Sequence, residues 1–146
     1  MGYAGLVTWR MMVAGMTLAA CSRDAGVTVS SGYAFAPVSG ASMAAYVTLV
    51  NRGRVGDTLV SITSPLGSAA VHEQREMAGM VHMEPVGPIA IAPGDSLTLS
   101  PGGRHVMLEL SSGTPAAGDS VPLTLHLARG GEVTIRIPVR AYGDTP

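Results

Sequence analysis

Short runs in which apolar and polar residues alternate, separated by turn residues, fill most of this 146-residue chain. A two-residue alternation is typical of a strand with one face on a core, whereas a helix needs a longer stretch with a period near 3.6. No stretch of the second kind is present after the N-terminal segment. The pattern therefore predicts an all-β domain. Its expected strands and turns occupy 44–51, 57–64, 68–74, 87–94, 95–103, 104–110, 121–130 and 131–139.

The clearest strand pair lies near the C-terminus, where two strictly alternating runs flank Gly130 and Gly131. Glycine reaches the positive backbone angles that tight turns require, so these runs predict a β-hairpin with one apolar face. Each of about eight such strands must bury its apolar face against a second sheet. We therefore expect an antiparallel β-sandwich. The alternating apolar positions of the hairpin are Val121, Leu123, Leu125, Leu127, Val133, Ile135, Ile137 and Val139.

The N-terminal segment is typical of a secreted bacterial protein. Arg10 precedes a run of about ten apolar residues, well short of the roughly 20 that span a bilayer, so residues 1–20 are predicted to be a signal peptide. The run ends in Leu-Ala-Ala-Cys, which resembles the bacterial lipobox. We expect Cys21 to be lipidated and to anchor the protein on the periplasmic side of a membrane. The alternative is ordinary cleavage and a soluble periplasmic protein.

The composition of the chain beyond this leader indicates one domain on a short tether. Residues 21–33 are small and polar and are expected to form the lipidated cysteine with a flexible tether, which leaves residues 34–146 as one β-sandwich domain. Cys21 is the only cysteine, so the fold has no internal disulfide. The net charge is −1 and the nine basic residues are scattered, which argues against nucleic acid as a partner.

Soft metal ligands are concentrated in one part of the chain. Thioethers bind Cu(I) and offer little to Zn²⁺, Mg²⁺ or Ca²⁺, and imidazole accommodates copper readily. A mixed His and Met set therefore favours copper in its reduced state, although His82 could serve Cu(II), which favours nitrogen. The residues in question are His72, Met77, Met80, His82, Met83, His105 and Met107.

The run Arg-His-Val-Met-Leu-Glu-Leu at 104–110 suggests how part of this set is presented. Val106 and Leu108 alternate with His105 and Met107, so the first pair should face the core and the second pair the opposite side. Two residues apart on one face of a strand, His105 and Met107 can bind a single ion. His72 and Met83 bracket a segment that we expect to be a loop bending back toward this pair.

The spacing of these residues resembles a known family, the periplasmic copper chaperones of the PCu(A)C type. Their motif is a histidine, ten residues, a methionine, twenty-one residues, then His-x-Met, and His72, Met83, His105 and Met107 match all four positions. The resemblance extends to flanking segments such as Ile-Ala-Pro-Gly at 91–94 and 101–108. Family members often carry further methionines after the first histidine, where this chain has Gln74 and Glu76.

The resemblance implies a cupredoxin-like Greek-key sandwich. It also implies a Cu(I) site formed by the four motif residues, and delivery of copper to an acceptor protein such as the copper centre of cytochrome c oxidase. Met77, Met80 and His82 are candidates for secondary metal contacts.

Other functional classes fit less well. No catalytic arrangement of nucleophile, base or paired carboxylates is visible, so we do not expect an enzyme. A blue-copper electron carrier needs a cysteine ligand, and Cys21 is committed to the anchor. A metal-free, lipid-anchored β-sandwich that binds a protein partner remains open. It predicts no copper uptake by the purified domain.

Overall fold

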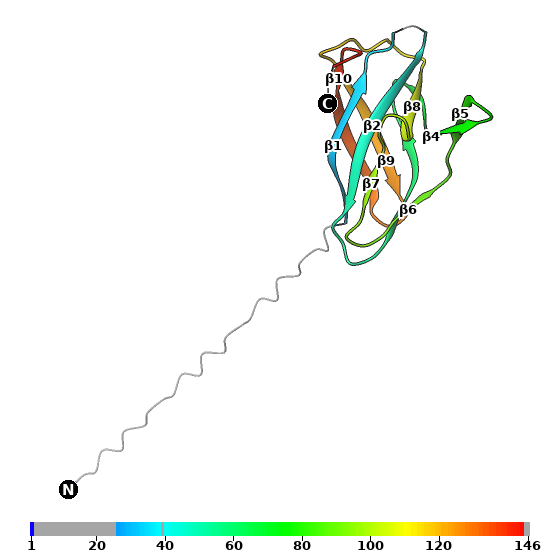
Figure 1. Cartoon of the computed structure of the whole chain (residues 1–146). Coiled ribbons are helices and arrows are strands. Elements are labelled where there is room, and N and C mark those ends of the chain that lie inside the picture. The colour runs from blue at the N-terminus through cyan, green and yellow to red at the C-terminus, as the bar shows by residue number, and fades with distance from the viewer. Residues whose placement is uncertain (2–25, 39, 145–146) are drawn as a thin grey trace.

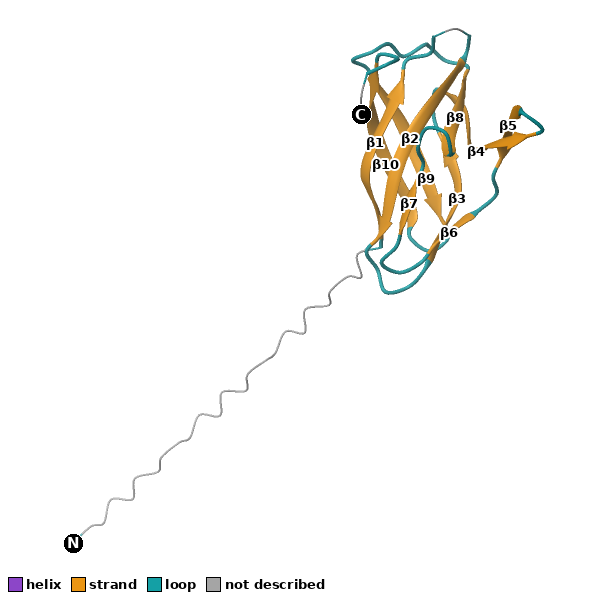
Figure 2. Ribbon diagram, viewed as in Figure 1, coloured by secondary structure: helices purple, strands orange, loops and turns teal. Residues whose placement is uncertain are grey.

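The computed structural model of the protein describes residue 1, residues 26–38 and residues 40–144. The expected signal peptide at 1–20 and the lipidation site at Cys21 lie outside these residues. The described part is built from strands and connecting turns (Figures 1 and 2), which confirms the all-β prediction. It contains no helix long and apolar enough to cross a membrane.

The strands form the two layers of a sandwich. The first layer, sheet A, has the order β5 (Met80–Pro85), β4 (Gly67–Met77), β8 (Arg104–Leu110), β2 (Ser42–Asn51) and β1 (Val27–Phe35), with β7 (Ser96–Thr98) also on β2. The second layer, sheet B, has the order β10 (Gly131–Arg140), β9 (Ser120–Leu127), β3 (Asp57–Thr63) and β6 (Ile89–Ile91).

The two layers are joined at one edge by β1 and β10, which pair in parallel at Ala34↔Val139 and Phe35↔Arg140. The expectation of a purely antiparallel sandwich is wrong at this pair. The other pairs are antiparallel, and the chain crosses repeatedly between the layers, as a Greek-key sandwich requires. The parallel pair lets the first and last strands close one side of the sandwich.

The core lies between the layers and follows the alternation read from the sequence. Val106 and Leu108 of β8 are fully buried, as predicted. The C-terminal hairpin is confirmed in register, with Gly131↔Leu127 at its turn and a φ of 72° at Gly131. Every second residue of β2 and β9 enters the same core. These residues are Met43, Ala45, Val47, Leu49, Val121, Leu123, Leu125 and Leu127.

The folded domain begins earlier than the sequence suggested. β1 starts at Val27, whose side chain is buried and whose backbone pairs with Asn51 of β2. The tether expected over residues 21–33 therefore extends at most to residue 26. The serine and glycine residues within this strand concealed it, because they interrupt the alternation of apolar side chains.

The segment between His72 and Met83 is a β-hairpin and not the expected loop. β4 and β5 pair continuously from His72↔Pro85 to Met77↔Met80. Ala78 and Gly79 connect them with φ values of 53° and 76°, the two positive angles of a type I′ turn. The hairpin projects from the side of the sandwich (Figure 1).

Candidate metal centre

His72 and His105 are direct cross-strand partners on the outer face of sheet A. The pairing of β4 with β8 places them opposite one another, with ring centroids 6.4 Å apart and ring planes inclined by 33°. Paired residues of antiparallel strands carry their side chains on the same face. The fold therefore brings together two imidazoles that are 33 positions apart in the chain.

The backbone fixes the orientation of the His105 ring. Its Nδ1 lies 3.2 Å from the carbonyl oxygen of Gly103, which also accepts the backbone N–H of Gln74 at 3.3 Å. A carbonyl can only accept, so this contact requires a proton on Nδ1 of His105, and in the tautomer that meets this requirement the lone pair is on Nε2. Such a second hydrogen bond is the usual way in which a protein orients a metal-binding histidine.

His72 has a different environment. Its Nδ1 is buried and has no hydrogen-bond partner. Buried polar atoms are nearly always satisfied, because leaving one unpaired costs about 1–3 kcal/mol. This unpaired nitrogen lies beside the oriented ring of His105. It is therefore suited to bind a ligand located between the two rings.

Met107 lies next to this pair, at a position flanked by small side chains. It is two residues beyond His105 on β8, and its cross-strand partners are Ala70 on β4 and Ala44 on β2. Alanine side chains on both sides leave the flexible thioether room to move over the sheet. His105 itself is only 5% exposed, although it lies on the outer face of β8.

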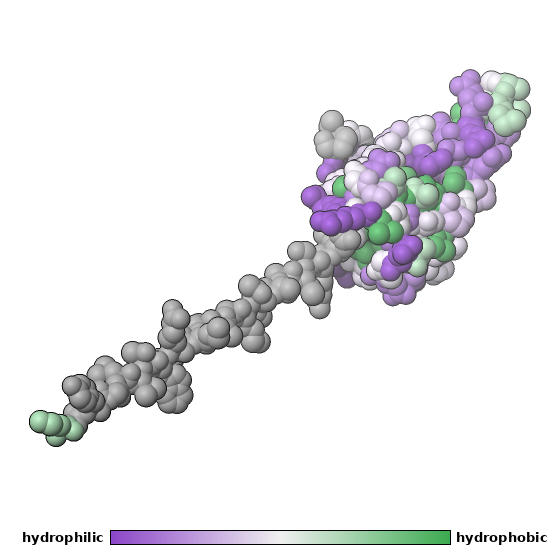
Figure 3. Space-filling model, turned by 90° about the horizontal axis from the view of Figure 1, so that it is seen from below, coloured by the Kyte–Doolittle hydropathy of each residue, from purple (hydrophilic) through white to green (hydrophobic). Residues whose placement is uncertain are grey.

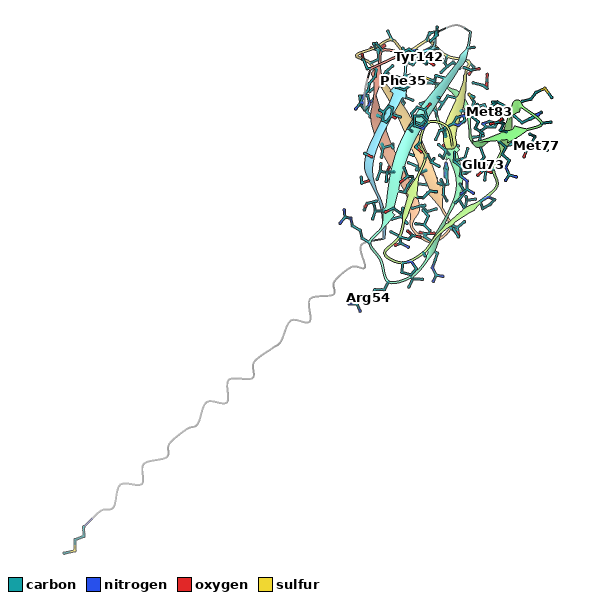
Figure 4. The ribbon with its side chains drawn as sticks, viewed as in Figure 1. Phe35, Arg54, Glu73, Met77, Met83 and Tyr142 are labelled. Carbon is teal, nitrogen blue, oxygen red and sulfur yellow. The ribbon has the colours of Figure 1, made fainter. Side chains whose placement is uncertain are left out.

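Met83 lies on the same face, but on the projecting hairpin. It pairs with Gln74, two residues beyond His72, so its side chain is on the His72 side of the hairpin. β4 separates β5 from β8, and two strand spacings amount to about 10 Å. Met83 is 47% exposed, and Figure 4 shows it between the hairpin and the sandwich. The structure thus groups His72, His105 and Met107, with Met83 at the outer side.

The candidates for secondary contacts lie elsewhere. Met77 pairs with Met80, and Arg75 pairs with His82. Alternation puts these residues on the face of the hairpin opposite to Met83. Within the described residues, no three His, Cys, Asp or Glu side chains cluster to hold a metal.

A charge network that the sequence analysis missed holds the base of the hairpin. Glu73 accepts hydrogen bonds from Arg75 at 2.8 Å and from Arg104, the neighbour of His105, at 3.0 Å. These two bonds lower the pKa of Glu73 below its ordinary value. Glu73 pairs with Arg104 across β4 and β8, so the contact ties the hairpin to the strand that carries His105.

An aromatic cluster, also missed, continues the outer face of sheet A. Tyr46 lies 6.4 Å from His105 between ring centroids and contacts Tyr33 at 5.1 Å and Phe35 at 6.0 Å. Burial, followed by the charges of Tyr33 and Tyr142, raises the pKa of Tyr46, so its phenol stays protonated. The alternation of Tyr33 and Phe35 in a short strand was the signal that could have revealed it.

Comparison with known proteins identifies the domain. The family model described as "Putative lipoprotein LpqE-like" matches residues 27–139. A relative, "Putative lipoprotein Lxx21020" of Leifsonia xyli subsp. xyli, is 31% identical over 119 residues, which cover 80% of this chain and 71% of that protein.

Solved structures with the same fold include the apo PCuAC domain from PmoF1, with 26% identity, a TM-score of 0.66, and coverage of 81% of this chain and 96% of that one. The copper-bound PCuAC domain from PmoF2 has 27% identity and a TM-score of 0.64, covering 81% and 95%. CuI-DR1885 from Deinococcus radiodurans has 30% identity and a TM-score of 0.65, covering 86% and 85%.

These likenesses define the class as a β-sandwich domain of the PCuAC type, which confirms the resemblance drawn from the motif. The chain belongs to the LpqE-like lipoprotein family.

Proposed function

We propose that this protein is a copper chaperone of the bacterial envelope, anchored through Cys21 on the periplasmic side. It binds Cu(I) through His72, Met83, His105 and Met107 and delivers the ion to an acceptor protein, such as the copper centre of cytochrome c oxidase. The copper-bound states of the PmoF2 domain and of DR1885 support copper as the cargo.

The observation that carries the proposal is the unpartnered, buried Nδ1 of His72 beside His105. If one nitrogen of each ring binds the same ion at about 2 Å, the two ring centroids lie about as far apart as they do here. Met107 adds a thioether at the same place. The resulting neutral set of nitrogen and sulfur ligands suits monovalent copper.

Delivery is explained by where the ligands lie. The histidines are held by the sheet, whereas Met83 is half-exposed on a projecting hairpin. An incoming ligand of the acceptor can therefore replace Met83 first, while the two imidazoles keep hold of the ion. Transfer by such stepwise exchange needs no unfolding, and the protein acts as a carrier and not as an enzyme.

The test is a Cu(I) titration of residues 22–146 against a chromophoric Cu(I) competitor. We expect His105→Ala and Met107→Leu to lower the affinity at least tenfold. The matched controls are His126→Ala in sheet B and Met43→Leu in the core, and both should leave it unchanged. Equal affinity in His105→Ala and the parent protein would remove the site assignment, and no uptake at all would favour the metal-free alternative.

Two double substitutions test the role of Met83 while keeping the number of methionines constant. Combining Met83→Val with Val81→Met keeps a thioether on the His72 face, two positions further out. Combining Met83→Val with Glu84→Met moves it to the opposite face. The first variant should retain part of the affinity and the second should behave like Met83→Ala. Retention of the parent's affinity in both variants would show that Met83 does not bind the ion.

A further inference from the structure

The hairpin carries a second set of soft ligands on the face that points away from the proposed site. Met77 and Met80 are direct cross-strand partners, and His82 is two residues beyond Met80 on β5. Cβ atoms of such a pair are about 5 Å apart, and residues two apart on a strand share a face. The register therefore gathers two thioethers and one imidazole at the end of the hairpin.

This arrangement repeats the ligand spacing of the proposed site. There, His105-x-Met107 lies on one strand, and here Met80-x-His82 lies on one strand in the reverse order. In each case the neighbouring strand contributes a further soft ligand, His72 in the first and Met77 in the second.

The two methionines have no packing role that accounts for them. Met77 is 57% exposed and Met80 is 62% exposed. The outer end of the hairpin is a hydrophobic tip beyond a hydrophilic stretch (Figure 3), and Figure 4 shows Met77 there. Exposed thioethers on a hairpin, residues 72–85, that contributes no side chain to the hydrophobic core are better explained by a ligand than by packing.

Arg75, a cationic residue beside these ligands, forms an ion pair with Glu73. Arg75 is the cross-strand partner of His82 and would repel a bound metal ion. Its guanidinium is instead bound to Glu73, 2.7 Å away between Nη2 and Oε2, on the side away from the tip. Glu84 adds attraction and, with Glu73, raises the pKa of Arg75. The positive charge is thus offset near the base of the hairpin.

We propose that Met77, Met80 and His82 form a second Cu(I) site with two sulfur ligands and one nitrogen ligand. Because the hairpin is one sheet thick, an ion at this site is on the other side of the strands from His72 and Met83. The three residues therefore cannot complete the first site, and each site can be lost separately.

The test is the stoichiometry of Cu(I) uptake by residues 22–146. The parent protein should bind two equivalents. Met77→Leu with Met80→Leu should bind one, His105→Ala should bind one, and the combination should bind none. The leucine substitutions are exposed and of similar volume, so folding should be retained. Ag(I), which is redox-inert, should shift the NMR signals of the Met77 and Met80 methyl groups and the His82 ring in His105→Ala.

The first site, on which the proposed function rests, and the second site can be refuted independently. A single equivalent that is lost in His105→Ala and kept in the double leucine variant would overturn the second site and leave the proposed function intact. A single equivalent with the reverse behaviour would overturn the first site. Unchanged NMR signals at the hairpin end with Ag(I) would also refute the second site.

Discussion

Asp57 is expected to be one of the main polar contributors to stability. It lies at the start of β3 and joins this strand to the turn of the C-terminal hairpin. Its carboxylate accepts the backbone N–H groups of Arg129 at 2.9 Å and Gly130 at 2.8 Å, which lie in the turn between β9 and β10. It also accepts the N–H of Thr58 at 2.7 Å. Asp57 is 8% exposed, so most of it is shielded from water.

The size of the effect of Asp57→Ala can be worked out from these bonds. A hydrogen bond to a charged group contributes about 1.5–3 kcal/mol, and two of the three join distant parts of the chain. The turn borders a hollow on the surface where water can partly replace the carboxylate. We therefore take the lower end, about 3 kcal/mol out of a total of about 5–15 kcal/mol. This corresponds to a fall in Tm of about 10 °C.

Urea unfolding of the parent protein and of Asp57→Ala measures this difference. Asp119→Ala is the control, since that carboxylate accepts one local N–H at an exposed turn. Copper affinity should stay the same, because the proposed ligands are on sheet A. A loss of stability below about 0.5 kcal/mol, the range of ordinary surface substitutions, would refute the reasoning.

The pH dependence gives a second readout of Asp57. Burial raises its pKa, but the backbone N–H groups of Thr58, Arg129 and Gly130, together with the charge of Arg129, lower it further, so the pKa falls below 3.8. A carboxyl group with a lowered folded-state pKa stabilises the fold above its unfolded pKa, and this contribution is lost as the pH falls through the folded value. Asp57→Asn should remove this part of the acid destabilisation.

Four further substitutions address β4 and the hairpin that it forms with β5. A methyl group on Gly67 would collide with the carbonyl oxygen of Glu109, so Gly67→Ala should lower the free energy of unfolding by about 3 kcal/mol or more, measured in urea. Ala78→Asn should stabilise the hairpin by up to about 1 kcal/mol, since Asn tolerates the positive φ better than Ala. Slower amide exchange in β5 would show this stabilisation. Ala78→Pro should destabilise the hairpin and speed this exchange. Glu73→Gln should speed amide exchange in the hairpin at neutral pH. The difference should be smaller in high salt, and it should shrink as the pH falls below 4.5 through the lowered pKa of Glu73, where the parent loses the same charge.

Periodicity predicted most of the fold because the sandwich has one buried face per strand. The alternating runs around Val106 and Leu125 gave correct strands with the correct inward residues. β1 was missed because its apolar residues are diluted by serine and glycine. Its parallel pairing with β10 could not be predicted either, since it depends on how the two layers meet and not on any local pattern.

The sequence predicted that His72, His105 and Met107 lie near one another, but not how the fold brings them together. Spacing selected His72, His105 and Met107, which the structure places side by side. The orienting bond from His105 to the Gly103 carbonyl and the Glu73 network are invisible in the sequence, because both depend on the register of β4 against β8. The hairpin was taken for a loop, since its Ala-Gly turn is a weak signal beside Asn-Gly.

The hairpin register gives the spacing between the first histidine and the first methionine a physical meaning. With a two-residue turn at 78–79, even-numbered residues of β4 share a face with odd-numbered residues of β5. A methionine separated from His72 by ten intervening residues, as Met83 is, has the parity of the His72 face, whereas Met80 and His82 have the opposite parity and join Met77. A mobile loop would let all of these side chains converge on one ion. A paired hairpin instead sorts them into two groups, so the same turn that directs Met83 toward the first site excludes the other soft ligands from it.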